Sequence, residues 1–377
     1  MQTKSFGKLV VFFLLLSGLS LGIFIGKFKA DKVDIFSKNA ITAKIERVYN
    51  WQMRNFNESE RYSRRWQFAT LRIGIMAAYR VTNNPRYLKE ALEWSEENRW
   101  ETGFDTRDKA NLRHIDPPAD NQCCAQTYLE LYLIKKDPRM LASAQSAFDK
   151  LLNDSPRGRE EWWWVDALFM APPALARLGR ATNEIKYYNL LHEMWWDTAS
   201  LLFDEDANLF YRDAESFKER SQNGRKVFWA RGNGWAMAGI ARVVDYLPEE
   251  DSKRIEYIKL FKRMANAVIE VQAEDGLWRT SLLDSSEFPG PETSSSSLFC
   301  FALAWGINHG ILDRAVFLPA VEKAWKGLYL AVDKNGKLCC VQKPNRKPGP
   351  VSKDDTAEHG VGAFLMAASE MIKLNIK

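Results

Sequence analysis

Apolar residues recur at helical spacing along almost the whole chain from Lys38 onward, at positions i, i+3, i+4 and i+7. Strand patterns are scarce. The best candidate for a short β-hairpin surrounds Asn335-Gly336, a turn dipeptide flanked by the runs GLYLAV and KLCCVQ. The pattern therefore predicts an all-α protein with a small β excursion.

Two kinds of helix alternate along this pattern. One kind is apolar on most faces and belongs inside a fold, while the other has a charged face that belongs outside. The apolar helices are expected at residues 66–80, 122–134, 162–179, 232–246, 293–307 and 357–372. The amphipathic helices are expected at residues 40–54, 86–98, 139–152, 185–201, 252–272 and 315–330. The alternation predicts six helical hairpins.

A sequence repeat marks the joints within these hairpins. Residues 80–87 (RVTNNPRY) match residues 180–187 (RATNEIKY), and each copy connects an apolar helix to an amphipathic one. Units of this kind at intervals of about 50–65 residues indicate a repeat architecture. We expect an (α/α)6 barrel that forms a single domain over residues 38–377. An open superhelical solenoid is the alternative, although solenoid repeats are usually shorter and more uniform.

The first thirty residues differ from the rest. Leu9–Gly26 is an apolar run of 18 residues preceded by two lysines, and residues 1–30 contain no acid. This order is typical of a secretory signal, and the run also reaches the lower limit for a membrane span. Residues 1–30 are therefore expected to be a signal peptide or an N-terminal membrane anchor. The remainder is expected to be exported, either to the periplasm or facing it from the membrane.

Charge and composition exclude several classes of protein. The net charge is +5, and the four lysines of residues 1–30 account for all but one of these charges, so no nucleic-acid footprint remains. A content of 46% hydrophobic and 27% charged residues excludes a largely disordered chain. The 14 tryptophans indicate either a large aromatic core or platforms for sugar rings. The five cysteines lack metal-ligand spacing, so no metal site is expected.

Two acidic residues stand at the starts of predicted inner helices. Asp166 follows three tryptophans in EWWWVDALFMAPP, and Asp120 begins the segment DNQ. Burial raises the pKa of a carboxyl group toward the range of a general acid, whereas the alternative role for both residues is helix capping. In a closed ring the starts of the inner helices gather at one end. Two carboxylates facing one cavity there would suit acid–base chemistry on sugars.

Further candidates lie in or near the same helix starts. Arg231, in FWARGNGW, offers a planar donor fork for a carboxylate, and Trp235 offers a flat face for a sugar. The glycines beside Asn233 predict a tight turn close to a ligand. Trp66 belongs either at the same rim or in the core. His192 lies on a predicted amphipathic helix, where a lone histidine is more often structural.

Taken together, these segments resemble the unsaturated uronyl hydrolases of glycoside hydrolase family 105 and, more distantly, of family 88. The resemblance rests on four stretches in the expected order, WWWVDALFMAPPALARLGRATNEIKYY, FWARGNGWAMAGIARVVDYLP, ETSSSSLFCFALAWGINHGIL and GVGAFLMAASEM. It implies the same barrel, with Asp166 as the catalytic acid/base and Asp120 as a second active-site carboxylate. It also implies that His192, Arg231 and Trp235 contact the sugar. The chain departs from the family at Asn121 and Ala125, where the family often has Asp and a nearby Gly.

The resemblance further implies an exo-acting enzyme that removes a terminal 4,5-unsaturated galacturonyl or glucuronyl residue from oligosaccharides made by polysaccharide lyases. Asp166 would protonate C4, water would add at C5, and the resulting hemiketal would expel the rest of the sugar without a metal or organic cofactor. A conventional inverting glycosidase that acts on saturated oligosaccharides is the first alternative. A non-catalytic carbohydrate-binding toroid is the second. Rhamnogalacturonan, ulvan, another algal polyuronate and a glycosaminoglycan all fit as the parent polymer.

Overall fold

The computed structural model describes residues 34–57, 60–103, 118–154 and 158–374. The predicted leader, residues 1–30, lies outside these ranges. Within them, no helix is both long enough and apolar enough to cross a membrane. Most of the described chain is helical, as the periodicity predicts.

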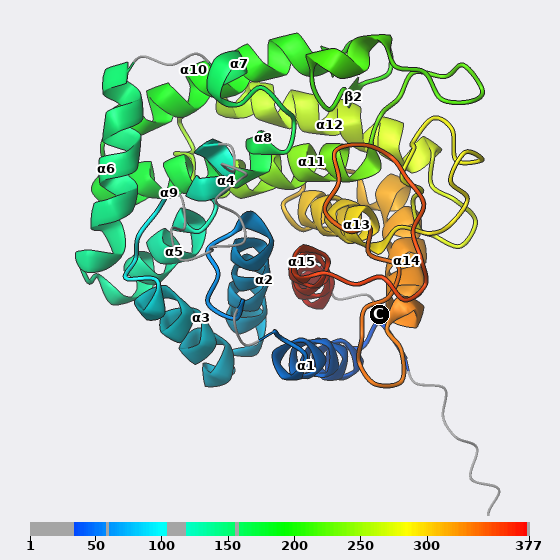
Figure 1. Cartoon of the computed structure of the whole chain (residues 1–377), viewed down its shortest axis with the longest axis horizontal. Coiled ribbons are helices and arrows are strands. Elements are labelled where there is room, and N and C mark those ends of the chain that lie inside the picture. Colours follow the sequence, from blue (N-terminus) through cyan, green and yellow to red (C-terminus); the bar gives the residue numbers. More distant parts are fainter. Residues whose placement is uncertain (1–33, 58–59, 104–117, 155–157, 375–377) are drawn as a thin grey trace, which may run out of the picture. The chain divides into compact units, whose positions relative to one another are not determined.

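The apolar helices form a closed inner ring (Figure 1). In chain order they are α2 (Trp66–Thr82), α5 (Ala125–Lys135), α9 (Pro172–Thr182), α11 (Ala230–Val244), α13 (Thr293–Asn308) and α15 (Glu358–Leu374). Each helix packs against the next, and α15 packs against α2. The ring therefore closes, which confirms the barrel and excludes the open solenoid.

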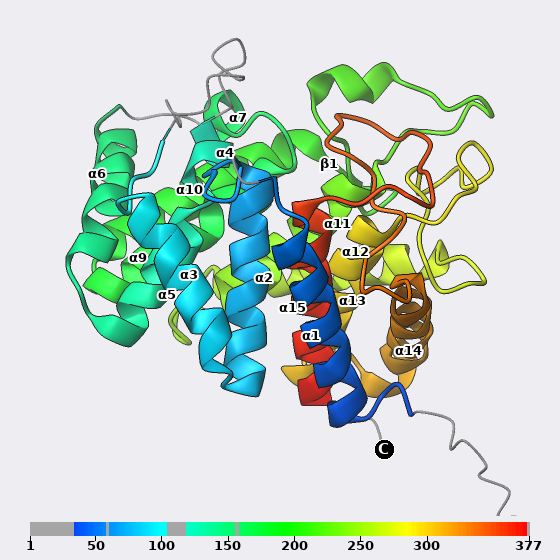
Figure 2. The same ribbon diagram turned by 60° about the horizontal axis from the view of Figure 1, so that its bottom comes forward.

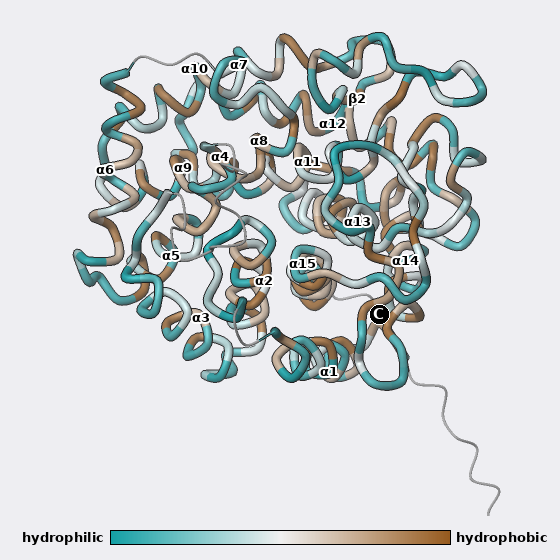
Figure 3. The backbone as a smooth tube through the Cα atoms, in the orientation of Figure 1, coloured by the Kyte–Doolittle hydropathy of each residue, from teal (hydrophilic) through white to brown (hydrophobic). Residues whose placement is uncertain are grey.

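The amphipathic helices surround this ring. They are α1 (Lys38–Arg54), α3 (Pro85–Glu97), α6 (Arg139–Asp154), α10 (Ile185–Leu202), α12 (Arg254–Glu270) and α14 (Arg314–Ala331). Each packs on neighbouring inner helices, as the tilted view shows (Figure 2). Every residue of α11 is buried, whereas α3 buries a single face. The outer helices accordingly contain both hydrophilic and hydrophobic residues (Figure 3).

The repeated joints have the same backbone conformation. Asn83 and Asn183 follow α2 and α9 with φ angles of 53° and 59°, in the left-handed region. The backbone N–H of Asn83 donates to the carbonyl of Tyr79, and that of Asn183 donates to the carbonyl of Gly179. The asparagine that both copies of the repeat share is therefore a helix C-cap residue, and asparagine tolerates the left-handed geometry there.

The third inner helix differs from its prediction. The sequence pattern places one helix over residues 162–179, but the structure has the short helix α8 (Ala167–Met170) followed by α9, which begins at Pro172. Pro172 and Pro173 have no N–H group, so neither can donate the hydrogen bond to a preceding carbonyl that continues a helix. The helix is therefore interrupted at Ala171. The first turn also begins at Ala167 instead of at residue 162, so Asp166 lies just before α8.

The first and last inner helices meet at two glycines. A Cβ atom on Gly362 would lie 2.3 Å from the backbone oxygen of Thr70, and one on Gly74 would lie 2.3 Å from the backbone oxygen of Gly362. Both distances are far below van der Waals contact. The backbones of α2 and α15 therefore touch directly, and this contact closes the ring.

Short strands occupy a place that the sequence analysis did not predict. β1 (Phe203–Asp204) pairs with β2 (Leu209–Phe210) in an antiparallel hairpin. Around Asn335-Gly336 the predicted turn is present, with Gly336 at φ 99°, but its flanks form one isolated bridge, between Val332 and Leu338, instead of strands. The hairpin prediction is therefore correct for the turn and wrong for the strands.

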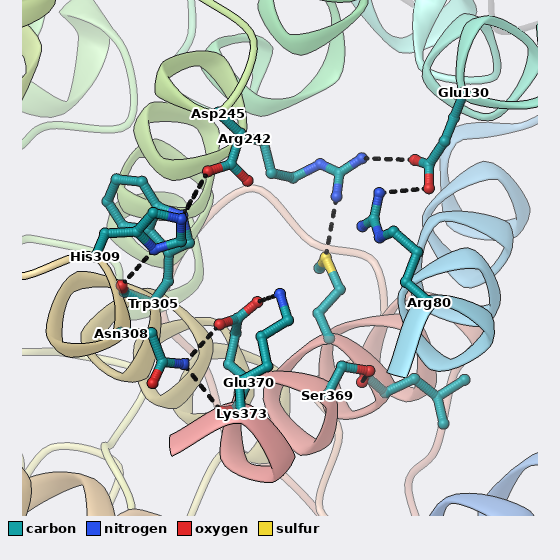
Figure 4. A network of polar contacts seen from close by, with 12 residues as sticks. Arg80, Glu130, Arg242, Asp245, Trp305, Asn308, His309, Ser369, Glu370 and Lys373 are labelled. Carbon is teal, nitrogen blue, oxygen red and sulfur yellow. Dashed lines mark hydrogen bonds and ion pairs between the residues drawn. The ribbon is translucent and has the colours of Figure 1, made fainter. Parts of the chain in front are cut away.

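A polar network joins the C-terminal ends of several inner helices (Figure 4). Glu130 of α5 pairs with Arg80 of α2 and lies 4.0 Å from Nη2 of Arg242 on α11. Asn308 at the end of α13 donates to Glu370 of α15 at 2.8 Å. These helices therefore end on the same side of the ring. Their N-termini gather on the other side, which we call the N-terminal end of the ring.

Candidate active site

Asp166 lies at the N-terminal end of the ring and does not cap the helix that follows it. Its backbone carbonyl accepts the first α8 hydrogen bonds, from the N–H groups of Phe169 and Met170. Its side chain makes no capping bond, and its Oδ2 atom is buried without a hydrogen-bond partner among the described residues. The capping interpretation of Asp166 is therefore wrong. The carboxyl group is left available for chemistry.

The surroundings of Asp166 shift its protonation equilibrium. Burial raises the pKa of the Asp166 carboxyl above its ordinary value, and the positive charges of Arg212 and Arg231 oppose this effect without cancelling it. A raised pKa keeps more of the group protonated near neutral pH. That is the property a general acid requires.

The backbone on either side of Asp166 is fixed by a distant segment. The N–H of Val165 donates to the carbonyl of Arg212 at 2.8 Å, and Trp164 forms an isolated antiparallel bridge with Asp213. Asp213 in turn accepts hydrogen bonds from the N–H and hydroxyl groups of Ser216. The loop after β2 therefore holds the segment that carries Asp166.

Helix α11 approaches the same segment closely. Gly232 and Gly234 lie inside α11, so the tight turn predicted around Asn233 is wrong. A Cβ atom on Gly232 would lie 2.7 Å from Cγ1 of Val165, and one on Gly234 would lie 2.9 Å from Cβ of Leu298. The glycines are needed because two neighbouring elements pack against this turn of the helix. The amide of Asn233 instead pairs with the backbone N–H and carbonyl of Phe210 in β2.

Asp120 comes from an adjacent element. It lies on the short helix α4 (Pro118–Gln122), its side chain is buried, and α4 packs against α8. The structure thus brings together two short helices, α4, which contains Asp120, and α8, which directly follows Asp166. The role of Asp120 stays a prediction.

Arg231 does not have the free donor fork that its sequence context suggests. Its Nη1 atom donates to the carbonyl of Gln342 at 2.6 Å, and its Nη2 atom donates to the carbonyl of Lys343 at 3.2 Å. The guanidinium also lies over the ring of Trp229, 4.5 Å from its centroid. Arg231 is almost fully buried. It therefore braces the chain after α14, and the expected two-bond contact with a substrate carboxylate is not available to it.

The two predicted aromatic residues have different environments. Trp235 is fully buried, with its ring centroid 4.5 Å from that of Phe169 and 6.2 Å from that of Trp66. Trp66, the first residue of α2, is half-buried, and its ring centroid lies 5.0 Å from that of His359. Trp235 therefore supports the site from the core. Trp66 keeps an exposed part that can meet a sugar.

The structure does not bring His192 to this group. His192 lies on the outer helix α10, where Nδ1 is 3.1 Å from the hydroxyl of Tyr257 and Nε2 is 3.0 Å from a carboxylate oxygen of Asp251. Both ring nitrogens are therefore occupied by residues in or just before α12. His192 therefore belongs to the contact between α10 and the start of α12.

Glu292 and the serines after it form a helix cap. Oε1 of Glu292 accepts from the N–H and hydroxyl of Ser294 and from the N–H of Gln342, while Oε2 accepts from the N–H of Ser295. The loop braced by Arg231 is thus tied to the start of α13 as well. Among the described residues, no group of three or more His, Cys, Asp or Glu side chains is arranged to hold a metal ion.

Sequence reasoning missed Arg212. This residue follows β2, and its guanidinium lies 5.0 Å from the ring centroid of Trp163, which precedes Asp166 by three positions. The local signal is a basic residue between an aromatic strand and an acidic cap, LFYRDAES. This pattern indicates a site residue only once the pairing of the segment with residues 164–165 is known.

Comparisons with known proteins agree with this geometry. Residues 44–375 match the family model described as Glycosyl Hydrolase Family 88. The chain is 35% identical over 328 residues to an unsaturated 3S-rhamnoglycuronyl hydrolase of Formosa agariphila, which covers 82% of this chain and 84% of that protein. It also resembles the solved structure of a glycosyl hydrolase family 88 protein from Bacteroides vulgatus, with a TM-score of 0.83, 33% identity, and coverage of 90% of this chain and 99% of that chain.

A structure from Salmonella enterica, described as a possible member of the GH105 family, has a TM-score of 0.74 at 17% identity and covers 95% of this chain and 99% of that chain. At that identity it shows the shared fold alone. Both families that the motifs resemble are thus represented among similar structures, and the matching family model spans the inner and outer helices together. The chain is a glycoside hydrolase that belongs to glycosyl hydrolase family 88.

Proposed function

We propose that this enzyme removes a terminal 4,5-unsaturated uronic acid from oligosaccharides that polysaccharide lyases release. One observation carries the proposal: the Oδ2 atom of Asp166 is buried, the carboxyl has a raised pKa, and the side chain is not used as a cap. An acid in that state can protonate a carbon–carbon double bond. The half-buried Trp66 gives the neighbouring surface the aromatic character that sugar binding favours, and the buried Trp235 supports it from the core.

The reaction proceeds by hydration of the double bond. The unsaturated uronate is a vinyl ether, so protonation of C4 by Asp166 leaves positive charge on C5 that the ring oxygen shares. Water adds at C5 and returns one proton to the Asp166 carboxylate, which restores the acid. The hemiketal opens to a ketone at C5, and the hemiacetal formed at C1 releases the aglycone with its hydroxyl group. One water molecule is consumed, and the residue acts as both acid and base.

Asp120 supplies the second carboxylate of the proposal. Its helix packs against α8, so its side chain belongs to the same end of the ring as Asp166. A carboxylate there can orient the attacking water or hold a hydroxyl group of the terminal sugar. Asp120 therefore contributes positioning, while the proton transfers belong to Asp166.

The sugar beyond the scissile bond is proposed from similarity. The relative from Formosa agariphila is named an unsaturated 3S-rhamnoglycuronyl hydrolase and covers most of this chain. We accordingly propose an unsaturated rhamnoglycuronyl oligosaccharide as the substrate. Unsaturated rhamnogalacturonyl and glycosaminoglycan disaccharides are the comparison substrates.

The test follows the ultraviolet absorption of the unsaturated uronate in lyase-generated disaccharides, with product analysis by chromatography. We expect the absorption to disappear fastest with the unsaturated rhamnoglycuronyl substrate, while a disaccharide that differs only in having no double bond stays intact. Cleavage of the saturated disaccharide at a comparable rate would show that the enzyme is a conventional inverting glycosidase instead. No reaction with either kind of disaccharide would favour a carbohydrate-binding toroid.

Export is part of the same proposal. Lysines precede the apolar run Leu9–Gly26, which is the order of a secretory signal or an N-terminal anchor. Cell fractionation with intact-mass measurement of the recovered protein tests this. We expect the protein in the periplasmic or membrane fraction, and recovery of the full-length chain from the cytosol would contradict export.

A further inference from the structure

The proposed substrate carries a negative charge next to the reacting double bond, and a cation near Asp166 is needed to hold it. Arg231 is unsuited because both of its Nη atoms already donate to backbone carbonyls. Arg212 is the other arginine whose charge acts on Asp166. The two arginines differ in position and in the bonds they make.

Arg212 is placed beside Asp166 by backbone pairing. Its carbonyl accepts the N–H of Val165 at 2.8 Å, and the next residue, Asp213, bridges to Trp164. Residues 164–165 and 212–213 therefore run side by side, and Asp166 follows directly. This backbone pairing fixes the position of the Arg212 main chain.

The guanidinium of Arg212 is oriented but only partly used. Nη1 donates to the Asp213 carboxylate, and Trp163 covers the guanidinium at a centroid distance of 5.0 Å. Nε is buried with no hydrogen-bond partner, and no partner for Nη2 is found among the described residues. An arginine held on one side by Asp213 and Trp163 keeps donors on Nε and Nη2 that make no hydrogen bond to the described residues. Planar recognition of a carboxylate uses such a pair of donors.

Arg212 and its neighbour Trp163 are both partly exposed to solvent, where a ligand can reach them. Trp163 is 36% exposed, whereas Trp162 and Trp164 on either side of it are buried. The Arg212 side chain itself keeps 12% of its surface exposed, in contrast to the almost fully buried Arg231. An exposed aromatic ring, a partly exposed cation and the Asp166 carboxyl therefore lie on consecutive, paired stretches of backbone.

Building on the proposed function, we propose that Arg212 binds the carboxylate of the terminal unsaturated uronate and thereby selects charged over uncharged substrates. Asp213 and Trp163 are positioning residues that hold the guanidinium. The bound carboxylate places C4 of the sugar beside Asp166. Arg231 acts through the fold, by bracing the loop around Gln342.

The experiment compares an unsaturated uronyl disaccharide with its methyl ester, which lacks only the uronate charge. The enzyme variants are Arg212→Met, Arg212→Lys, Arg231→Lys and a control, Arg220→Met. Arg220 is a matched control because it lies eight residues further on, is exposed, and within the described ranges donates only to the nearby carbonyls of Phe217 and Glu219. Thermal unfolding of each variant reports whether the fold is kept.

We expect the wild type to prefer the acid, and Arg212→Met to lower kcat/KM about tenfold to a hundredfold on the acid but less than about threefold on the ester. Arg212→Lys should retain part of the preference, because it keeps the charge without the planar fork. Arg231→Lys should change both rates by the same factor, and Arg220→Met should change neither. An Arg212→Met enzyme that keeps the wild-type ratio of acid to ester rates would overturn the assignment.

A second readout separates substrate binding from damage to the site. Arg212 lowers the pKa of Asp166, so its replacement by Met should move the high-pH limb of the activity profile to higher pH. A loss of activity on both substrates with an unmoved profile would mean that Arg212 has only a structural role. If the proposed function itself is wrong, the wild type fails to consume either unsaturated disaccharide, and this outcome is distinct from an unchanged ratio.

Discussion

The guanidinium of Arg231 donates a 2.6 Å hydrogen bond to the backbone carbonyl of Gln342, a residue 111 positions later in the chain. The N–H of the same Gln342 donates to Glu292, which caps α13. Arg231 therefore links the start of α11, the start of α13 and the loop before α15. This bond gives Arg231 a structural role, although the residue lies in the distinctive motif FWARGNGW.

Replacing Arg231 by Met should therefore act on stability. The change leaves the carbonyls of Gln342 and Lys343 without their donor, and an unsatisfied buried polar group costs about 1–3 kcal/mol. We expect a lower free energy of unfolding in a denaturant titration, with equal loss of activity toward charged and uncharged substrates. Arg225→Met, at an exposed position nearby, serves as the control. An unchanged stability for the Arg231 variant would contradict the bracing role.

Replacing Asp166 by Asn should separate catalysis from folding. Loss of general acid–base catalysis reduces turnover by about two to four orders of magnitude. Substrate affinity should be kept, because the side chains are nearly isosteric. Steady-state kinetics and ligand titration check this against Asp206→Asn, whose side chain is 95% exposed. Near-normal turnover of the Asp166 variant would remove this residue from the mechanism.

The same substitution has a predicted effect on stability that depends on pH. Because the pKa of Asp166 is raised in the folded state, the folded protein binds more protons than the unfolded chain between the ordinary and the raised pKa. The contribution of Asp166 to stability is thus present at low pH and is lost as the pH rises through this window. Asn has no such loss, so the variant should gain stability relative to wild type from pH 4 to pH 8 in thermal unfolding. A relative loss over this range would indicate a carboxylate stabilised by the fold.

Trp66 and Trp235 should respond differently to truncation. Trp235→Ala removes a fully buried ring and should cost about 3–5 kcal/mol of stability. Trp66→Ala removes a half-buried ring at the N-terminal end of α2 and should raise KM about threefold to tenfold with a smaller loss of stability. Kinetics and chemical denaturation of both variants check this. A larger stability loss for Trp66 with an unchanged KM would place Trp66 in the core only.

The closure of the ring can be tested at Gly362. A Cβ atom at this position would lie 2.3 Å from the backbone oxygen of Thr70, so Gly362→Ala should force α2 and α15 apart and destabilise the fold by about 1–3 kcal/mol. Gly290→Ala is the control, because the nearest atom to its Cβ would be 3.5 Å away. Equal unfolding midpoints for the two variants would mean that the contact between α2 and α15 is not tight in solution.

The helices could be predicted because hydrophobic periodicity records which face of each helix is buried. The sequence places an inner helix at residues 293–307, and the structure has α13 at Thr293–Asn308. The predicted extent of the third inner helix is wrong because its apolar character continues through Pro172 and Pro173, which lack the N–H groups that continue a helix. Hydrophobic periodicity indicates which residues are buried, but it does not indicate whether the helix is continuous.

The site was predictable where one residue stands out locally, as Asp166 does. The roles of Arg231 and Trp235 depend on partners that periodicity cannot identify, such as Gln342 and Phe169. The same limit hid Arg212, whose neighbours Trp163 and Val165 lie nearly fifty positions earlier and reach it through backbone pairing. Residue types and spacing predict which groups are present, but burial and long-range contacts decide which of them are free.

The most direct measurement of the central claim follows deuterium into C4. Wild-type enzyme is incubated with the unsaturated disaccharide in D₂O, and the product is examined by NMR before it exchanges further. If Asp166 protonates C4, deuterium enters on one face of the former double bond, and Asp166→Asn slows its entry together with the loss of ultraviolet absorption. Deuterium distributed equally over both faces would mean that the aglycone leaves by direct displacement and that the released unsaturated sugar rearranges in solution, which would contradict the hydration mechanism.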